Sequence, residues 1–160
     1  MRWFHYTLFI FTLVLASCSG KQPVEKAIVG TWLQEIPTST TSDGLQTTTT
    51  DTILTLRKSG ETQLTRNLDI AGQGLPENGV KIKVELRGQW EIIDGQLKQT
   101  QNTALIIPRT DDKMARDWAD QLQAQADKSQ SSVKNIVLVD KRQLILQDLE
   151  TGTTDTYRRK

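Results

Sequence analysis

Residues 80–95 read VKIKVELRGQWEIIDG. Every second residue, beginning at Val80, falls on one face of an extended chain: Val80, Ile82, Val84, Leu86, Gly88, Trp90 and Ile92. The residues between them are mostly charged or amide side chains, so this period of two predicts a long, half-buried antiparallel strand. Asp94 and Gly95 supply the two positive-φ positions of a tight hairpin.

The same alternation recurs along the rest of the chain and predicts a mainly all-β domain. Turn residues separate about eight predicted strands, near residues 27–41, 45–57, 61–70, 79–93, 96–101, 133–139, 143–149 and 153–159. Such an antiparallel meander has to close, or nearly close, to hide its two edge strands. We therefore expect a closed or nearly closed barrel over residues 27–160.

One helix is predicted between the fifth and sixth of these strands, over residues 111–129. Thr110 is a plausible N-cap, and Asp111 and Asp112 suit the positive end of the helix dipole. Apolar residues then recur at helical spacing, namely Met114, Ala115, Trp118, Ala119, Leu122 and Ala126. Trp118 is interpreted as packing against the sheet. The alternative is that this apolar stripe covers an open barrel or docks a partner helix.

The first 18 residues resemble a bacterial lipoprotein signal. Arg2 precedes an apolar run that ends in Leu15-Ala16-Ser17-Cys18, and Cys18 is the only cysteine. The resemblance implies a signal peptide over 1–17, lipids on Cys18 and a tether over 18–26. An uncleaved transmembrane anchor is disfavoured because the run is short and contains His5. A plain secretory signal is disfavoured because it leaves an unpaired thiol in an oxidising compartment.

The same resemblance indicates where the anchored protein lies. Ser19 follows Cys18 where an inner-membrane retention signal would have aspartate. This implies an outer-membrane lipoprotein, attached to the periplasmic face of the membrane through the lipid on Cys18.

The composition after Cys18 excludes several kinds of chemistry. His5 is the only histidine, so the mature chain has no Ser-His or Cys-His pair and no usual zinc ligand set. Asp111 and Asp112 are better explained by the start of the helix than as a catalytic carboxylate pair. We therefore predict no enzyme activity, no metal and no cofactor.

The charges of the mature chain balance, with 19 Lys and Arg once Arg2 is removed against 19 Asp and Glu. A chain without net positive charge has no overall basic field to attract nucleic acid or an anionic membrane face. Nucleic-acid binding is therefore not expected.

Two copies of Gly-x-Trp, at Gly30-Thr31-Trp32 and Gly88-Gln89-Trp90, lie inside predicted strands. The first copy opens the first strand and resembles the Gly-x-Trp signature of lipocalins and of small bacterial lipocalin-like lipoproteins. The resemblance implies that a cationic side chain from the end of the barrel covers Trp32. Arg158 or Arg159 is therefore expected within about 6 Å of that ring.

Two functions remain open from the sequence. The first is a non-catalytic binding or assembly module for another envelope protein, and the Thr-rich stretch 38–50 is its candidate edge for strand pairing. The second is a lipocalin-like carrier of a small apolar ligand. The candidate ligand-binding or core residues are Trp32, Trp90, Val84, Leu86, Trp118 and Arg158. A filled barrel favours the module, and an open one favours the carrier.

Overall fold

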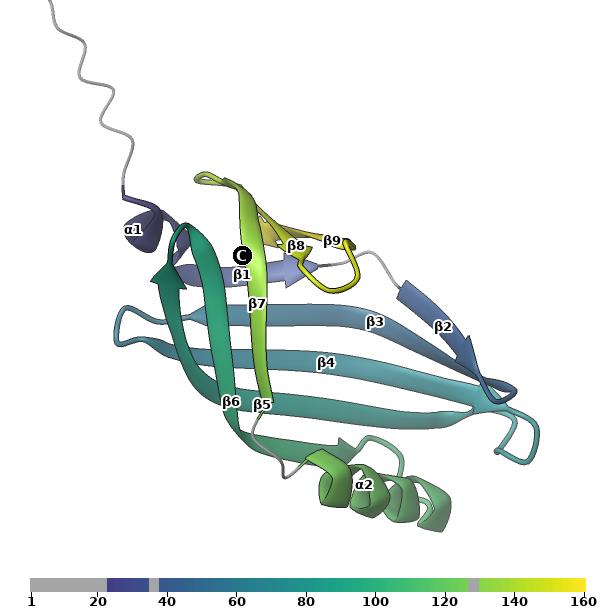
Figure 1. Ribbon diagram of the computed structural model, residues 1–160. Helices are drawn as coiled ribbons and strands as arrows, with labels where there is room; N and C mark the ends of the chain where they lie inside the picture. Colours follow the sequence, from purple (N-terminus) through teal and green to yellow (C-terminus); the bar gives the residue numbers. More distant parts are fainter. Residues whose placement is uncertain (1–22, 35–37, 127–129) are drawn as a thin grey trace, which may run out of the picture.

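The computed structural model describes residues 23–34, 38–126 and 130–160 (Figure 1). Cys18 and the predicted signal peptide lie outside these ranges. The elements follow one another as α1 (Val24–Ile28), β1 (Gly30–Gln34), β2 (Thr38–Ser42), β3 (Leu45–Leu56), β4 (Glu61–Gly72), β5 (Val80–Ile93), β6 (Gln96–Pro108), α2 (Lys113–Ala126), β7 (Gln130–Val139), β8 (Gln143–Asp148) and β9 (Thr154–Arg159).

The strands form a closed antiparallel barrel, as the alternating pattern predicts. Strands β3 to β9 follow one another as antiparallel neighbours, and β1 pairs with both β3 and β9. This gives eight strands in the barrel and one extra strand, β2, which pairs with β3 alone among the described strands. Two-residue turns with positive φ close the β2–β3 and β5–β6 hairpins, at Asp43-Gly44 and Asp94-Gly95.

The predicted first strand, 27–41, is wrong as a single element. Within the described residues this range holds the end of α1 and two separate strands, β1 and β2, which lie one after the other along the same edge of β3. Gln34 of β1 pairs with Thr52, whereas Thr38 of β2 pairs with Thr49. A bulge in β3 between Thr49 and Asp51 marks the place where its partner changes. A bulge bends its strand, so β2 departs from the barrel wall there.

The predicted position of the helix is also corrected. The strand before α2 is the sixth, β6, and it continues to Pro108 rather than ending near residue 101. Residues 103–108 pair with β5 on one side only, because the pairing of β6 with β7 is confined to Gln96–Gln101. Proline is tolerated at the end of such an edge.

The helix α2 begins later than predicted, with Asp112 rather than Thr110 as its cap. The carboxylate of Asp112 accepts a 2.7 Å hydrogen bond from the backbone N–H of Ala115. This is the N-cap to N3 bond that satisfies a free amide of the first turn. The Thr110 hydroxyl and the Ala115 amide both lower the pKa of the Asp112 carboxyl.

The apolar side chains form two clusters, one near each end of the barrel. The first surrounds Trp32 and fills the end where α1 lies; its buried members are Ile28, Trp32, Leu54, Leu56, Leu97, Leu144, Leu146 and Tyr157. The second lies beneath α2 and has fewer fully buried members, Ile70, Val80, Ile82 and Ala115.

No helix within the described ranges is long and apolar enough to span a membrane.

The side chain of Gln123 on α2 takes the place of a missing strand beside β6. Its Oε1 accepts a 2.9 Å hydrogen bond from the backbone N–H of Ile106, and its Nε2 donates a 2.9 Å bond to the carbonyl of Ala104. These two groups lie on the part of β6 that β7 does not reach. One side-chain amide therefore supplies both the acceptor and the donor that a neighbouring strand would offer.

We expect Gln123→Glu to destabilise the protein more than an ordinary surface change. A carboxylate can still accept from Ile106 N–H but cannot donate to the carbonyl of Ala104, and an unmade hydrogen bond of this kind costs about 1–3 kcal/mol. Urea unfolding measures the loss. Gln121→Glu, at an exposed position on the same helix, is the control and should change the free energy of unfolding by less than about 0.5 kcal/mol. Equal effects of the two changes would contradict this role for Gln123.

Candidate functional site

The contact between Arg159 and Trp32 joins the last strand to the first. The guanidinium carbon of Arg159 lies 4.2 Å from the centre of the Trp32 ring, and Trp32 is fully buried. Arg159 Nη2 and Nη1 also donate hydrogen bonds to the carbonyls of Ala27 (2.6 Å) and Val29 (3.0 Å). The indole Nε1 donates to the carbonyl of Ile28 at 2.8 Å. Three consecutive carbonyls at the end of α1 are therefore satisfied by these two side chains.

The prediction that Arg158 or Arg159 covers Trp32 is confirmed for Arg159. Arg158 is exposed, and it stands opposite Leu33 and Gln143 in the strand ladder. Neighbouring residues of a strand point to opposite faces, so only one of two adjacent arginines can reach the barrel interior. Tyr157 and Arg159 share the inner face of β9.

Gly30 leaves space for the Arg159 guanidinium. A Cβ atom at position 30 would lie 2.6 Å from Arg159 Nη1, and the backbone there has φ of 152°. A side chain at this position would meet both a steric and a conformational penalty. The glycine of the first Gly-x-Trp motif thus leaves space for Arg159, and the tryptophan of the same motif stacks against its guanidinium.

The second Gly-x-Trp motif has a different physical cause. A Cβ atom at Gly88 would lie 1.9 Å from the carbonyl oxygen of Thr100, because the register of β5 and β6 shifts next to Gly88. Here the glycine permits the close approach of two backbones at a bulge. Trp90 is half-buried, and its Nε1 donates a 2.9 Å hydrogen bond to the carbonyl of Arg57 in the β3–β4 turn.

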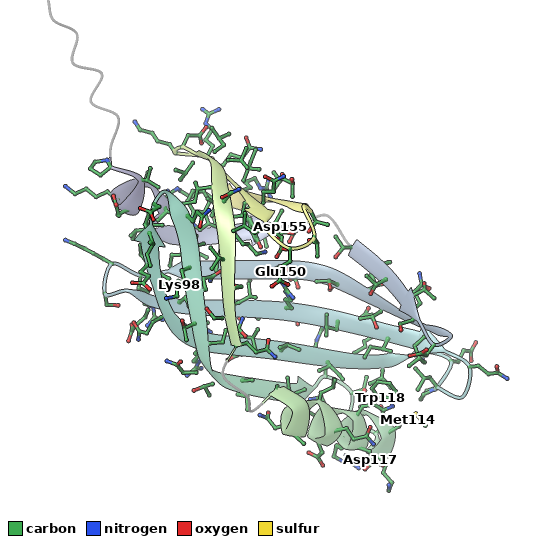
Figure 2. The ribbon with its side chains drawn as sticks, in the orientation of Figure 1. Lys98, Met114, Asp117, Trp118, Glu150 and Asp155 are labelled. Carbon is green, nitrogen blue, oxygen red and sulfur yellow. The ribbon has the colours of Figure 1, made fainter. Side chains whose placement is uncertain are left out.

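The other candidate residues do not gather into one site. Trp32 and Trp90 belong to the cluster near α1, whereas Val84 and Trp118 pack on the cluster beneath α2. Leu86 is half-buried on β5, opposite Leu64 and Ala104. In Figure 2, Trp118 and Met114 lie on the side of α2 that faces the strands, and Asp117 lies on the other side. Trp118 therefore packs against the sheet, as interpreted from its helical spacing.

Charged side chains lie between the two apolar clusters. Lys134 Nζ on β7 forms a 2.6 Å ion pair with Asp155 Oδ2 on β9, and the two side chains are only 15% and 26% exposed. Burial and the nearby Asp155 carboxylate raise the pKa of the Tyr157 phenol, whereas the positive charge of Arg66 opposes that rise. Arg66 stands on β4, opposite Thr52 and Val84, so its charge acts on β9 from another part of the barrel.

Sequence reasoning missed this charged group, although a signal was present. Residues 62, 64, 66, 68 and 70 share one face of β4, and this face includes the buried Thr62 and Ile70. Arg66 is therefore a charged side chain in an inward-facing row. Asp155 has the same parity as the buried Tyr157 on β9. A charge on the apolar face of an alternating strand is the observation that could have revealed the group.

A hollow of about 380 Å³ lies on the outer wall of the barrel, beside the bulge at Gly88. Its lining is polar and includes Arg57, Glu61, Gln63 and Arg87. This lining does not suit a small apolar ligand.

The outer edge of β2 is a second feature that the barrel itself does not use. Each of its five residues, Thr38–Ser42, is exposed. The edge of β2 that faces away from β3 has no strand neighbour among the described residues. In a two-residue hairpin the residues alternate in bonding to the partner strand, so Ser39 and Thr41 direct their backbone groups outward.

Within the described ranges, no group of three or more His, Cys, Asp or Glu side chains is placed to hold a metal ion.

No family model matches the chain, and no curated protein matches its sequence.

We expect Arg159→Ala to lower the free energy of unfolding by about 2–4 kcal/mol. The change removes a cation–π contact and two charge-assisted hydrogen bonds to backbone carbonyls. Arg158→Ala, one residue earlier and exposed, is the matched control and should change the stability much less. Chemical denaturation followed by tryptophan fluorescence measures both.

A double-mutant cycle with Gly30→Ala tests the shared geometry. The alanine Cβ displaces the guanidinium of Arg159. The loss in free energy of unfolding caused by Gly30→Ala should therefore be smaller when Arg159 has already been replaced by alanine. Strictly additive effects of the two substitutions would contradict the argument that Gly30 makes room for Arg159.

Proposed function

We propose that this protein is a lipid-anchored, non-catalytic binding module of the cell envelope. In this proposal it pairs through the edge of β2 with an extended segment of another envelope protein. The observation that carries the proposal is the unprotected β2 edge, which is held outside a barrel whose α1 end is already filled.

The anchor is proposed from Cys18 and its resemblance to a lipoprotein signal. The described chain begins at Pro23, and α1 lies at one end of the barrel (Figure 1). An attachment at Cys18 is compatible with this placement, because the lipid would then lie next to that end. Ser19 supports placement on the periplasmic face of the outer membrane, as the same resemblance implies.

The composition of β2 supports its use as a pairing edge. Natural edge strands are commonly protected by lysine, proline or a bulge, which block the addition of another strand. The segment Thr38-Ser39-Thr40-Thr41-Ser42 has none of these, and threonine favours extended structure. An added strand would gain backbone hydrogen bonds to Ser39 and Thr41, which is the mode of recognition called β-augmentation.

Cys18→Ser tests the anchor. The variant should lose labelling by radioactive or alkyne-bearing fatty acid and should move from the membrane fraction to the soluble fraction. The physical reason is that stable attachment requires acyl chains, and no described helix can replace them. Membrane retention of this variant would contradict the lipid anchor.

Thr41→Pro tests the edge. Proline removes the outward N–H at position 41 without removing a bond to β3. We expect the yield of an adduct formed in cells by a photo-reactive residue at position 40 to fall about tenfold or more. Thr41→Val keeps the N–H and a β-branched shape, so it should preserve the adduct. Equal adduct yields for the two variants would contradict strand addition at β2.

The carrier of a small ligand is the second candidate, and the charged group inside the barrel favours it. Arg66, Lys134 and Asp155 lie beyond the filled end, near an apolar cluster in which Val84 and Trp118 are only half-buried. The closed barrel and the Arg159–Trp32 contact support the resemblance to lipocalins. An absent adduct, together with saturable quenching by oleate that Trp118→Phe removes, would favour this candidate over the module.

A further inference from the structure

The two ends of the barrel carry opposite charges, although the chain as a whole is nearly neutral. Strand directions place α1, three turns and the last residues at one end, which we call the α1 end. Its basic residues are Lys26, Arg57, Lys58, Lys141, Arg142, Arg158, Arg159 and Lys160, and its acidic residues are Glu25, Glu61, Asp94 and Asp140.

The opposite end reverses this balance. It comprises the β2–β3, β4–β5 and β8–β9 turns and the segment from Arg109 through α2. Its acidic residues are Asp43, Glu77, Asp111, Asp112, Asp117, Asp120, Asp148 and Glu150, and its basic residues are Arg109, Lys113 and Arg116. The balanced composition predicts no basic field, but folding separates the charges and creates one.

The basic charge at the α1 end is available to an external partner. Lys26, Lys58, Lys141 and Lys160 are exposed, and none forms an ion pair with a residue in the described ranges. Arg57 pairs with Glu61 at 3.4 Å, but both side chains are more than half exposed. Such exposed pairs are weak and screened by solvent.

Four of the six large apolar side chains that are exposed within the described ranges lie at the same end, and the other two, Leu105 and Leu149, do not. Val24 in α1 is 37% exposed, and Ile93 beside the β5–β6 turn is 44% exposed. Val137 and Leu138, near the β7–β8 turn, are 57% and 39% exposed, and α1 contacts β7. The register shift between Ile136 and Leu138 leaves Val137 outside the regular ladder. Basic residues with scattered apolar ones match the interfacial region of a bilayer, which has acidic headgroups above acyl chains.

The proposed anchor places this end beside the membrane. Four residues, 19–22, separate Pro23 from the lipid-bearing Cys18, and the five residue steps between these two positions reach at most about 17 Å. The attraction between basic side chains and acidic headgroups decays over a Debye length of about 8 Å at physiological salt. The anchor would therefore hold Pro23, where α1 begins, within about two Debye lengths of the headgroups.

We infer that the α1 end rests on the acidic lipid surface to which the protein is anchored, with its lysines on the headgroups and Val24, Ile93, Val137 and Leu138 at the interface. This inference rests on the proposed lipid anchor at Cys18. The acidic end is repelled by the same surface, so α2 and the β2 edge point away from the membrane.

Hydrogen exchange of the mature lipidated protein in vesicles tests this orientation. One set of vesicles is phosphatidylcholine alone, and the other contains 30 mol% phosphatidylglycerol. With the acidic lipid, amides in the turns 57–60 and 140–142 should exchange at least several-fold more slowly, whereas turn 73–79 should not change. Equal exchange in the two vesicles, or slower exchange only at 73–79, would overturn the inference.

Matched charge reversals identify the cause of the protection. Replacing Lys58, Lys141 and Lys160 together by glutamate should abolish the difference between the two vesicles. Replacing Glu77, Asp120 and Glu150 together by lysine changes as many exposed charges at the other end and should leave the protection of 57–60 and 140–142 in place. Loss of protection in the second variant alone would contradict docking through the α1 end.

Flotation of the same vesicles separates the anchor from the docking. The wild-type chain and both triple variants should float with either vesicle, because the lipid on Cys18 suffices for attachment. Flotation of Cys18→Ser with phosphatidylcholine vesicles would refute the anchor. Normal flotation without any difference in exchange would refute only the docking.

Discussion

The stacking of Arg159 on Trp32 lies at the seam where the barrel closes. Strand β1 pairs with β3 over five residues but with β9 over only two, Trp32 with Arg159 and Leu33 with Arg158. So short a ladder offers few backbone hydrogen bonds to hold residues more than a hundred positions apart. Closing a loop of that length costs chain entropy before any contact is gained. The bonds from Arg159 to the carbonyls of Ala27 and Val29 reinforce the seam where the ladder is shortest.

A second discontinuity in the wall is repaired in a similar way. Strands β5 and β6 run alongside each other well beyond the point where β7 leaves β6, so part of β6 would have an unpaired edge. The amide of Gln123 bonds this edge, and the apolar side of α2 covers the inner residues of β5 beside it. Strands of unequal length thus form one closed barrel. The side chains of Arg159 and Gln123 supply hydrogen bonds to backbone groups where the strand ladders are short or missing.

The sequence predicted the strands well where each keeps one partner on each side along its length. Residues 80–93 come close to this, because β5 pairs with β4 over Val80–Gln89 and with β6 over Ile82–Ile93, and its inner face is buried or half-buried along its length. The split between β1 and β2 was not predictable, since both segments are extended and the change of partner occurs on β3. Trp32 and its arginine followed from a resemblance, but the choice between Arg158 and Arg159 depends on the register of β9. The role of Gln123 depends on a contact between α2 and β6. Local periodicity carries no information about such a contact between segments.

Net charge was the least informative quantity, because a sum over the chain discards position. Antiparallel topology returns alternate turns to the same end of a barrel, so the residues of alternate turns act together. The α1 end combines the filled apolar cluster, the closing arginine and the basic turns, whereas the half-buried Lys134–Asp155 pair and the exposed β2 lie outside that packing. An ion pair removed from water stabilises a fold little compared with apolar packing of the same volume. Under the proposed function, the α1 end provides stability and attachment, and recognition falls to the edge of β2, which lies outside the barrel.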